Sequence, residues 1–421
     1  MRALLLLLSC SLLQSCVKEY EAPVPNTTWE LFESNAAVPL GAPVRSRMTG
    51  VYDIVEGSAM FGTEAVLEWT WTREGADTAF HVSIFCERDM AYLTGAGKLL
   101  DSTILLNMYW RTLANTGTGL CRLTIAAEEG ALVLGTGGAL APGDIRITGK
   151  FGSDGDVPDR PITLVYQRPV DTPDGFQVLA HRCGGRNADL LPAAENSVEL
   201  IRMASRLGAT GVEMDVRLTS DGIPVLYHDG TLNTRAIRPC GLFGPIESYS
   251  YAQLSGVVRL IHGERIPTLR EALTTVVDQT PLTCVWLDIK FGGSLETIRA
   301  LQEEYMIAAQ AQGREVRILI GIPDEERLNA VLALPDHASV PSLCELDIPD
   351  VQAANSEVWA PRWTLGLQEA EVGQMHAEGR MAYVWTLDAP EYLVQFMQDG
   401  SFDGILSNYP SLVAFYNDAR Y

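Results

Sequence analysis

Residues 211–230 read GVEMDVRLTSDGIPVLYHDG, and this stretch decides the fold that we expect. Its first half alternates apolar and charged residues, which is the period of a β-strand, so Glu213 and Asp215 share one face. A short turn and a second apolar run follow, and that run ends at His228. The pattern therefore predicts two strands that present two carboxylates and a histidine near their ends.

Strands and helices alternate over residues 175–421. Asn196 is placed to cap a helix over 196–209, and Thr268 with Glu271 reads as a capping box that begins another helix. This alternation predicts a (β/α)8 TIM barrel, a fold of about 250 residues. Nine segments are strand candidates for its eight positions: 176–181, 211–217, 223–228, 283–290, 315–322, 341–346, 356–360, 381–387 and 403–407. We regard one of the segments 341–346 and 356–360 as marginal.

A different pattern precedes this barrel. Residues 29–168 contain short alternating segments separated by Gly, Asp and Asn, which predicts a smaller all-β domain, sandwich or barrel-like, of unknown function. A proline-containing linker near residue 170 separates the two domains. Aromatic residues at strand spacing are typical of a core, but they would also suit a ligand platform: Trp69, Trp71, Tyr109 and Trp110.

The N-terminus has the features of an export signal. Arg2 is followed by an apolar run too short to span a membrane, and residues 13–16 (LQSC) resemble a bacterial lipobox. We therefore expect a signal peptide over 1–15, lipidation of Cys16 and a polar tether over 16–28. This predicts an outer-membrane lipoprotein of a Gram-negative-type bacterium, attached to the membrane by its lipid and facing the periplasm or the cell surface.

Composition excludes some partners. Lys and Arg number 31 and Asp and Glu number 53, which gives a formal net charge of −22. Nucleic acid is therefore not expected as a partner. The six cysteines beyond the leader contain no Cys-x-x-Cys pair, which argues against a zinc cage. An exported chain allows disulfides, and Cys86 with Cys121 is a conceivable pair, although buried thiols are the simpler interpretation.

Polar residues cluster where the predicted strands end, which in a TIM barrel is the site of chemistry. Three carboxylates meeting at one mouth would repel each other unless a hard divalent cation with oxygen ligands lay between them. Two histidines can accept and donate protons near neutral pH, while arginine and lysine can bind a phosphate. The residues concerned are His181, Arg182, Glu213, Asp215, His228, Asp288 and Lys290. This combination favours phosphodiester cleavage over sugar isomerisation.

Each of these residues also has a purely structural interpretation. A single histidine at a strand end is more often structural than catalytic, but two beside paired carboxylates favour function. Arg182 could merely pair with Glu195, and Lys290 could be a solvated charge at the rim. Asp229 is expected to shape its loop and not to take part in the chemistry.

At these residues the sequence resembles the glycerophosphodiester phosphodiesterase family. The resemblance covers nearly all of 176–421 and follows the family order of motifs: AHRCGG (180–185), AENS (194–197), GVEMDVRLTSDGIPVLYHD (211–229), IPTLREAL (266–273), WLDIK (286–290), VWTLD (384–388) and DGILSNYP (403–410). It implies His181 and His228 as the acid/base pair and a Ca²⁺ or Mg²⁺ ion held by the three carboxylates. It also implies phosphate contacts from Arg182 and Lys290 and a pocket lined by Trp385.

The sequence departs from the family pattern at several points. Asp288 stands where the family usually has Glu, and Cys183 follows His-Arg where the family usually has Gly. The segments 186–192 and 233–264 are longer than usual, and both are expected to border the mouth.

The expected activity is hydrolysis of a glycerophosphodiester to an alcohol and glycerol phosphate. One alternative is a phospholipase-type phosphodiesterase that acts on intact lipid or phosphoinositide, for which 237–245 would supply a mildly apolar rim. Another is a non-catalytic surface lipoprotein whose β domain binds glycan or lipid. The complete set of histidines and acidic residues favours the enzyme.

Overall fold

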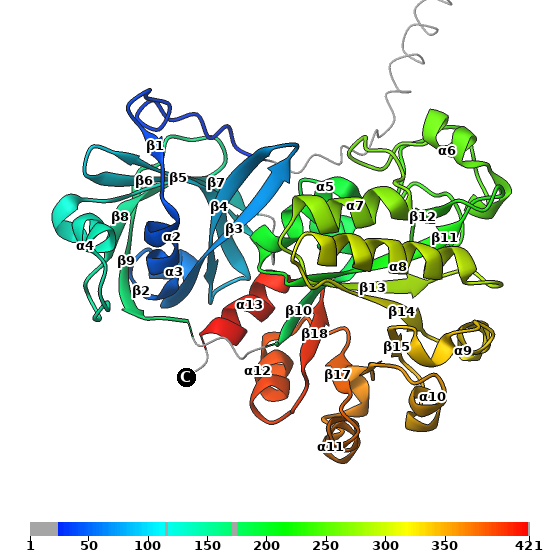
Figure 1. Ribbon diagram of the computed structural model, residues 1–421. Coiled ribbons are helices and arrows are strands. Elements are labelled where there is room, and N and C mark those ends of the chain that lie inside the picture. Colours follow the sequence, from blue (N-terminus) through cyan, green and yellow to red (C-terminus); the bar gives the residue numbers. More distant parts are fainter. Residues whose placement is uncertain (1–23, 114–116, 171–174, 420–421) are drawn as a thin grey trace, which may run out of the picture.

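The chain folds into two barrels that lie side by side (Figure 1). The computed structural model describes residues 24–113, 117–170 and 175–419. The predicted signal peptide, Cys16 and most of the tether lie outside these residues. None of the helices within the described ranges has both the length and the apolar character that a bilayer-spanning segment needs.

The first barrel is an antiparallel up-and-down barrel. Within the described residues, eight consecutive strands each pair with the next, and the last pairs with the first, so no sheet edge is left open. They are β2 (Gly50–Glu56), β3 (Glu64–Glu74), β4 (Asp77–Cys86), β5 (Ala91–Leu100), β6 (Thr103–Thr112), β7 (Thr118–Ile125), β8 (Arg146–Phe151) and β9 (Arg160–Arg168). The short β1 (Val38–Pro39) pairs with β5, and the short helices α2 (Ala42–Met48), α3 (Ser58–Phe61) and α4 (Ala131–Thr136) flank the barrel. Apolar side chains that alternate along the strands fill its interior.

The second barrel is the predicted TIM barrel. Eight strands of the described chain pair in parallel and close through β10 and β11. They are β10 (Gln177–Ala180), β11 (Gly211–Leu218), β13 (Cys284–Ile289), β14 (Arg317–Ile322), β15 (Ser342–Cys344), β16 (Val358–Trp359), β17 (Met381–Val384) and β18 (Gly404–Ser407). The helices around it are α5 (Val198–Ala204), α7 (Leu269–Gln279), α8 (Glu296–Ala311), α9 (Glu325–Leu332), α10 (Ile348–Ala353), α11 (Glu369–Ala377), α12 (Pro390–Gln398) and α13 (Pro410–Asp418), and α6 (Tyr251–Val257) lies in an insertion.

We expected one of the segments 341–346 and 356–360 not to be a barrel strand, and this expectation is wrong. Both 341–346 and 356–360 supply barrel strands, β15 and β16. The extra strand is β12 (Pro224–Leu226), which turns back and pairs antiparallel with β11. A two-residue period identifies a strand but not its partner, so the sequence pattern could not distinguish this hairpin from a barrel strand.

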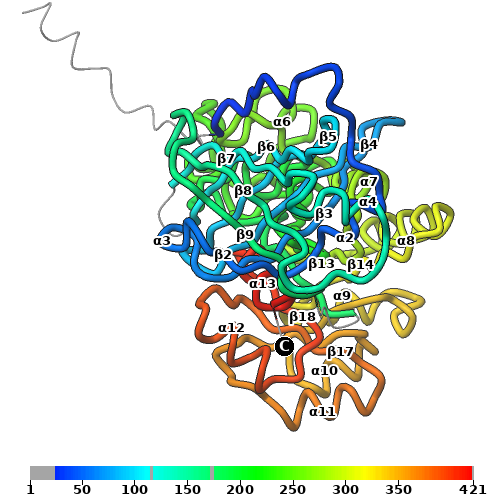
Figure 2. Tube along the Cα trace, turned by 90° about the vertical axis from the view of Figure 1, so that its left-hand side faces the viewer, coloured from blue at the N-terminus to red at the C-terminus, as the bar shows by residue number. Residues whose placement is uncertain are grey.

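The first barrel has an interior of its own, and some of its outward-facing side chains are buried in the apolar cluster of the second barrel. Val51, Val66 and Phe85 of the first barrel belong to the same buried cluster as the residues between the second barrel's strands and helices. Ser83 also donates a hydrogen bond of 2.7 Å to the carbonyl of Arg206, at the amino end of β11. Figure 2, seen from the antiparallel barrel's side, shows that barrel in front of the upper part of the molecule, with α11 and α12 below it.

Candidate active site

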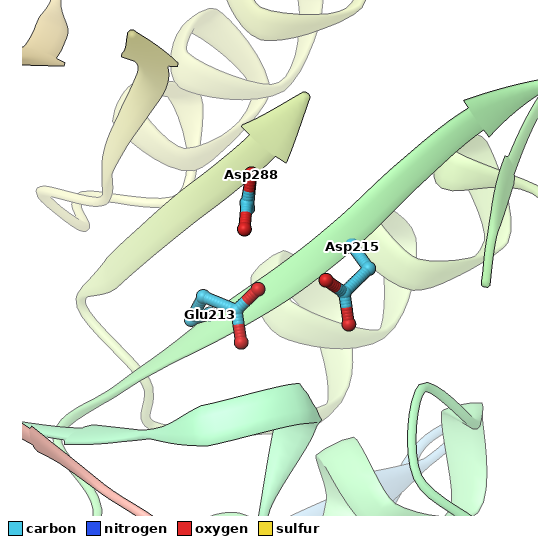
Figure 3. A group of neighbouring side chains, drawn as sticks. All are labelled: Glu213, Asp215 and Asp288. Carbon is cyan, nitrogen blue, oxygen red and sulfur yellow. The ribbon is translucent and has the colours of Figure 1, made fainter. Parts of the chain in front are cut away.

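Three carboxylates meet at the carboxyl ends of two neighbouring parallel strands. Asp215 of β11 is the register partner of Asp288 of β13, and Glu213 lies two residues earlier on the same face as Asp215. One oxygen from each of the three lies within 4.8 Å of the others. Figure 3 shows the three side chains converging on a common space. The register of one strand pair therefore produces the predicted acidic cluster.

The donor set fits a hard divalent cation. Glu213 and Asp215 are 2% and 0% exposed. Glu213 Oε1, Asp215 Oδ1 and Asp288 Oδ1 are buried without a hydrogen-bond partner anywhere in the described structure. Burial, together with the charges of Asp215 and Asp288, raises the pKa of Glu213 well above its ordinary value. Three buried carboxylate oxygens without hydrogen bonds are costly, even with the Lys290 ammonium 3.3 Å from Asp215 Oδ1. Coordination of Ca²⁺ or Mg²⁺ would relieve that cost.

Lys290 belongs to the same cluster. Its ammonium group contacts Asp288 and lies 3.3 Å from Asp215 Oδ1. Burial opposes the charge of Lys290, but the attraction of Asp288 and Asp215 outweighs burial and raises its pKa. Lys290 is thus a half-buried cation beside the carboxylates and not the solvated rim charge of the structural alternative.

His181 is held in one tautomer. It follows β10, and its Nδ1 lies 2.7 Å from Oδ1 of Asn408. The amide of Asn408 is oriented by Asp388, which accepts hydrogen bonds from its Nδ2 (2.6 Å) and its backbone N–H (2.9 Å). The Asn408 oxygen therefore accepts a hydrogen bond from the Nδ1–H of His181, so in the neutral ring Nε2 carries the lone pair. That Nε2 lies 3.8 Å from Glu213 Oε2.

The protonation state of His181 suits a base. Burial lowers its pKa most, and the charge of Arg182 lowers it further, against the opposing effect of Asp215. The ring is therefore neutral at pH 7, with its lone pair beside the acidic cluster.

His228 reaches the same space by another route than the one we expected. It follows β12, which is not a barrel strand, so the rule about carboxyl ends of parallel strands does not apply to it. The antiparallel return brings Tyr227 N within 2.9 Å of the Asp215 carbonyl. The imidazole of His228 acts electrostatically on both Asp215 and Asp288, as expected for a ring beside the cluster.

Asp229 orients the ring of His228. Its Oδ1 lies 2.7 Å from Nδ1 of His228, and its Oδ2 accepts hydrogen bonds from Asn233 and Arg235. Burial would raise the pKa of Asp229, but the hydrogen bonds from Arg235, His228 and Asn233 hold it below its ordinary value. Asp229 therefore contacts the His228 ring as well as two residues of its own loop.

Arg182 pairs with Glu195, as its purely structural interpretation predicted. Its Nη1 lies 3.1 Å from Glu195 Oε1, while its backbone N–H donates to Glu213 Oε2 at 2.7 Å. Its Nε is buried and has no hydrogen-bond partner among the described residues. Phosphate binding by Arg182 stays a prediction.

Trp385 lies between two other planar groups. Its ring packs edge-on against Trp286 at 6.3 Å, and the Arg362 guanidinium lies 4.5 Å from its ring centroid. Its Nε1 donates to the Ala360 carbonyl at 2.8 Å, which fixes the ring at the carboxyl end of β17. That this ring lines the substrate pocket stays a prediction.

Several residues near the site were missed from the sequence. Asn196 does not cap α5, because Ser197 does, and Asn196 instead exchanges hydrogen bonds with Asp215. Glu345 follows β15, and burial, with the charge of Asp288, raises its pKa to about 8. Its position at a strand end was a usable signal. No signal within the sequence linked Asn408 to His181, which are 227 residues apart.

The aromatic residues of the antiparallel barrel do not form one platform. Trp110 is 3% exposed and donates to the Gly152 carbonyl, whereas Trp71 packs near Arg73 and Arg314. The six cysteines of the described chain are all free, so Cys86 and Cys121 are the buried thiols of the simpler interpretation.

Comparison with known proteins gives one consistent result. Residues 181–325 match the model of the glycerophosphoryl diester phosphodiesterase family. Glycerophosphodiester phosphodiesterase 1 of Homo sapiens is 37% identical over 147 residues, which cover 34% of this chain and 42% of the human protein. A glycerophosphodiester phosphodiesterase of Caldanaerobacter subterraneus is 28% identical over 240 residues, covering 55% and 94% of the two chains. This chain thus spans less than half of the human relative's length.

A solved structure is also similar. The crystal structure of a glycerophosphodiester phosphodiesterase from Parabacteroides distasonis has a TM-score of 0.45 and 22% identity, covering 57% of this chain and 95% of that one.

Proposed function

We propose that this protein, whose residues 181–325 match the model of the glycerophosphoryl diester phosphodiesterase family, hydrolyses glycerophosphodiesters to an alcohol and glycerol phosphate. The observation that carries the proposal is the convergence of three carboxylates, each with a buried oxygen that has no hydrogen-bond partner among the described residues. Further support comes from His181 and His228, whose Nδ1 atoms each contact a neighbouring side chain, Asn408 and Asp229 respectively. This arrangement supports metal-dependent acid/base cleavage of a phosphate ester.

The residues would divide the reaction as follows. A Ca²⁺ or Mg²⁺ ion held by the three carboxylates would supply Lewis-acid stabilisation of the phosphoryl oxygens. Arg182 and Lys290 would bind non-bridging oxygens and offset the charge that develops in the transition state. His181 Nε2 would accept the proton of the attacking hydroxyl, and His228 would protonate the departing alkoxide as its P–O bond breaks. Both a neighbouring glycerol hydroxyl and water suit this proton transfer.

The test is an assay of glycerophosphocholine and glycerophosphoethanolamine with added Ca²⁺ or Mg²⁺. We expect metal-dependent release of glycerol phosphate, and a loss of about 10²- to 10⁴-fold in His181→Ala. Phosphorus NMR during turnover would distinguish the two attacking groups, because only the glycerol hydroxyl gives a cyclic phosphate. Inactivity on every glycerophosphodiester, or full activity in His181→Ala, would overturn the proposal.

A phospholipase-type activity is the second candidate. Phe243, within the predicted apolar rim, is 81% exposed. An exposed aromatic side chain near the mouth would favour contact with an acyl chain. A comparison of lysophospholipid with its deacylated counterpart separates the two candidates, because only a lipid-directed enzyme prefers the acylated substrate.

We further propose that the protein is an outer-membrane lipoprotein, anchored through Cys16. Support for this comes from the leader sequence alone. Labelling with a radioactive fatty acid in a bacterial host tests it. We expect label in the wild-type protein and none in Cys16→Ala, and equal labelling of both would contradict the proposal.

A further inference from the structure

The segment 233–264 borders the candidate active site and is anchored to it. Its buried apolar side chains, among them Ile237 and Leu260, form a cluster that also includes Tyr227, next to His228. Glu264 accepts a hydrogen bond of 3.0 Å from the backbone of Ala194. The insertion is therefore a packed unit fixed to the site at its far end, and its first residues are held against catalytic loops.

Arg235, near the start of this insertion, bridges two carboxylates. Its Nε donates to Asp229 Oδ2 at 2.8 Å, and its Nη2 donates to Glu195 Oε1 at 2.7 Å. Its own backbone is tied on both sides, since its N–H donates to Asn233 and its carbonyl accepts from Asn187. Charge-assisted contacts from two arms of one planar guanidinium fix both distance and orientation.

The two carboxylates each hold a residue of the proposed reaction. Asp229 accepts from Nδ1 of His228 at 2.7 Å. Glu195 is 4% exposed and accepts from Arg182 through Oε1 at 3.1 Å, so Arg182 and Arg235 share one oxygen. Arg235 therefore stands between the proposed acid and the proposed phosphate ligand without touching either of them.

We propose that Arg235 is a positioning residue that couples the orientation of His228 to the availability of Arg182, which rests on the proposed function. By binding Asp229, it fixes the carboxylate that orients the imidazole. Arg235 also binds the Glu195 oxygen that Arg182 contacts, so Arg182 is not the only cation that neutralises Glu195. Arg182 can then direct N–H groups to a phosphate oxygen. Without it, Glu195 would hold Arg182 more firmly and Asp229 would lose a partner that fixes its rotamer.

The experiment compares Arg235→Ala with Arg235→Lys and with a matched control, Arg265→Ala. Arg265 lies next to the insertion and forms an exposed ion pair with Glu271. For an outer-shell partner of an active residue we expect about a 10- to 100-fold fall in kcat/KM in Arg235→Ala. Arg235→Lys, which keeps the charge but not the two-armed contact, should be intermediate, and Arg265→Ala should match the wild type.

Two further measurements separate positioning from folding. The Arg235 side chain is 41% exposed, so free guanidinium ion can enter the space left in Arg235→Ala and should restore part of kcat, but not in Arg265→Ala. In the Asp229→Asn background the effect of Arg235→Ala should shrink, because the residue acts through Asp229. Unchanged kcat/KM in Arg235→Ala, or a loss that is neither rescued nor reduced by Asp229→Asn, would overturn the inference.

A readout without turnover keeps this inference distinct from the proposed function. ¹⁵N and ¹H NMR of the imidazoles should show a downfield Nδ1 proton for His228 in the wild type, and its loss in Arg235→Ala. Wild-type inactivity on all diesters would overturn the proposed function alone. An unchanged His228 proton signal in Arg235→Ala would overturn the coupling alone.

Discussion

The molecule contains two eight-stranded barrels in its described part, one antiparallel and one parallel, and only the parallel one assembles an acidic site. In the antiparallel barrel, successive strands end at opposite rims, so residues after neighbouring strands lie far apart. In the parallel barrel, all strands end at one rim, and their last polar residues meet. Asp215 and Asp288 illustrate this, since they are register partners on adjacent strands. Strand direction, more than closure, is what creates the site.

The two barrels are nevertheless not independent. Phe85 of β4 is fully buried in the cluster that also holds Leu207 and Ala414 of the second barrel. A side chain at Gly208 would collide with Ala414 and the Phe85 ring, so the chain approaches closely there. The candidate active site therefore lies in one barrel, whereas residues of both barrels pack together where they meet.

The largest expected effect is the loss of the metal site in Glu213→Gln. Removing one charged ligand should lower metal-dependent activity by about 10³-fold, equivalent to several kcal/mol of transition-state stabilisation. Because Glu213 is buried beside two carboxylates, the same change should stabilise the metal-free protein. Thermal unfolding with chelator and with Ca²⁺ or Mg²⁺ measures both. A metal-induced rise in Tm as large as that of the wild type would contradict the prediction.

Glu213→Gln should also change how the stability of the metal-free protein depends on pH. The folded-state pKa of Glu213 is raised above its unfolded value, so the folded form binds the proton more tightly. Metal-free stability should therefore fall as pH rises from the ordinary carboxyl range through the raised pKa, and Glu213→Gln should reduce that slope.

The next largest effect is expected where the two barrels pack against each other. Phe85→Ala should destabilise the protein by about 3–5 kcal/mol, since the ring is fully buried. Both barrels should still unfold in one transition, because Val51, Val66 and Phe85 of the first barrel are buried in the apolar cluster of the second. Fluorescence and far-UV circular dichroism in urea would check this. Two separated transitions, with activity surviving the first, would show that the barrels are independent.

Asn408→Ala should act on chemistry without removing a reacting group. Losing the acceptor at Nδ1 of His181 frees the ring and its tautomer, and we expect about a 10- to 100-fold fall in kcat. The exposed Asn329 of α9 offers a control, because Asn329→Ala should leave kcat unchanged. Equal kcat in Asn408→Ala and the wild type would show that this hydrogen bond does not orient the base.

The smallest effect is expected from a histidine of the antiparallel barrel. His81 lies 2.8 Å from Thr72 Oγ1, and burial, with the charge of Arg206, lowers its pKa from 6.5 to about 4. Its folded-state pKa lies below the unfolded value, so its contribution to stability is present above pH 6.5 and is lost as pH falls towards 4. His81→Gln should flatten this part of the Tm-against-pH curve and leave activity at pH 7 unchanged. A parallel loss of activity would place His81 in the chemistry.

The sequence anticipated much of the site for a physical reason. Glu213 and Asp215 alternate with apolar residues, and a two-residue period places them on one face whatever surrounds the strand. The capping box at Thr268 was likewise readable, because all of its contacts lie within one turn, and the structure confirms it. Asn196 shows the limit, since a local preference for capping gave way to its hydrogen bonds with Asp215.

By itself, the sequence determined which segments form strands and helices and which residues could carry charge to their ends, because these depend on near neighbours. The tertiary structure alone decided that β12 turns back against β11, that Asn408 orients His181 and that Arg235 joins Asp229 to Glu195. It also decided the closure of the first barrel by β2 and β9. These features join residues distant along the chain or choose between equivalent strand partners, and a local period carries no information about either.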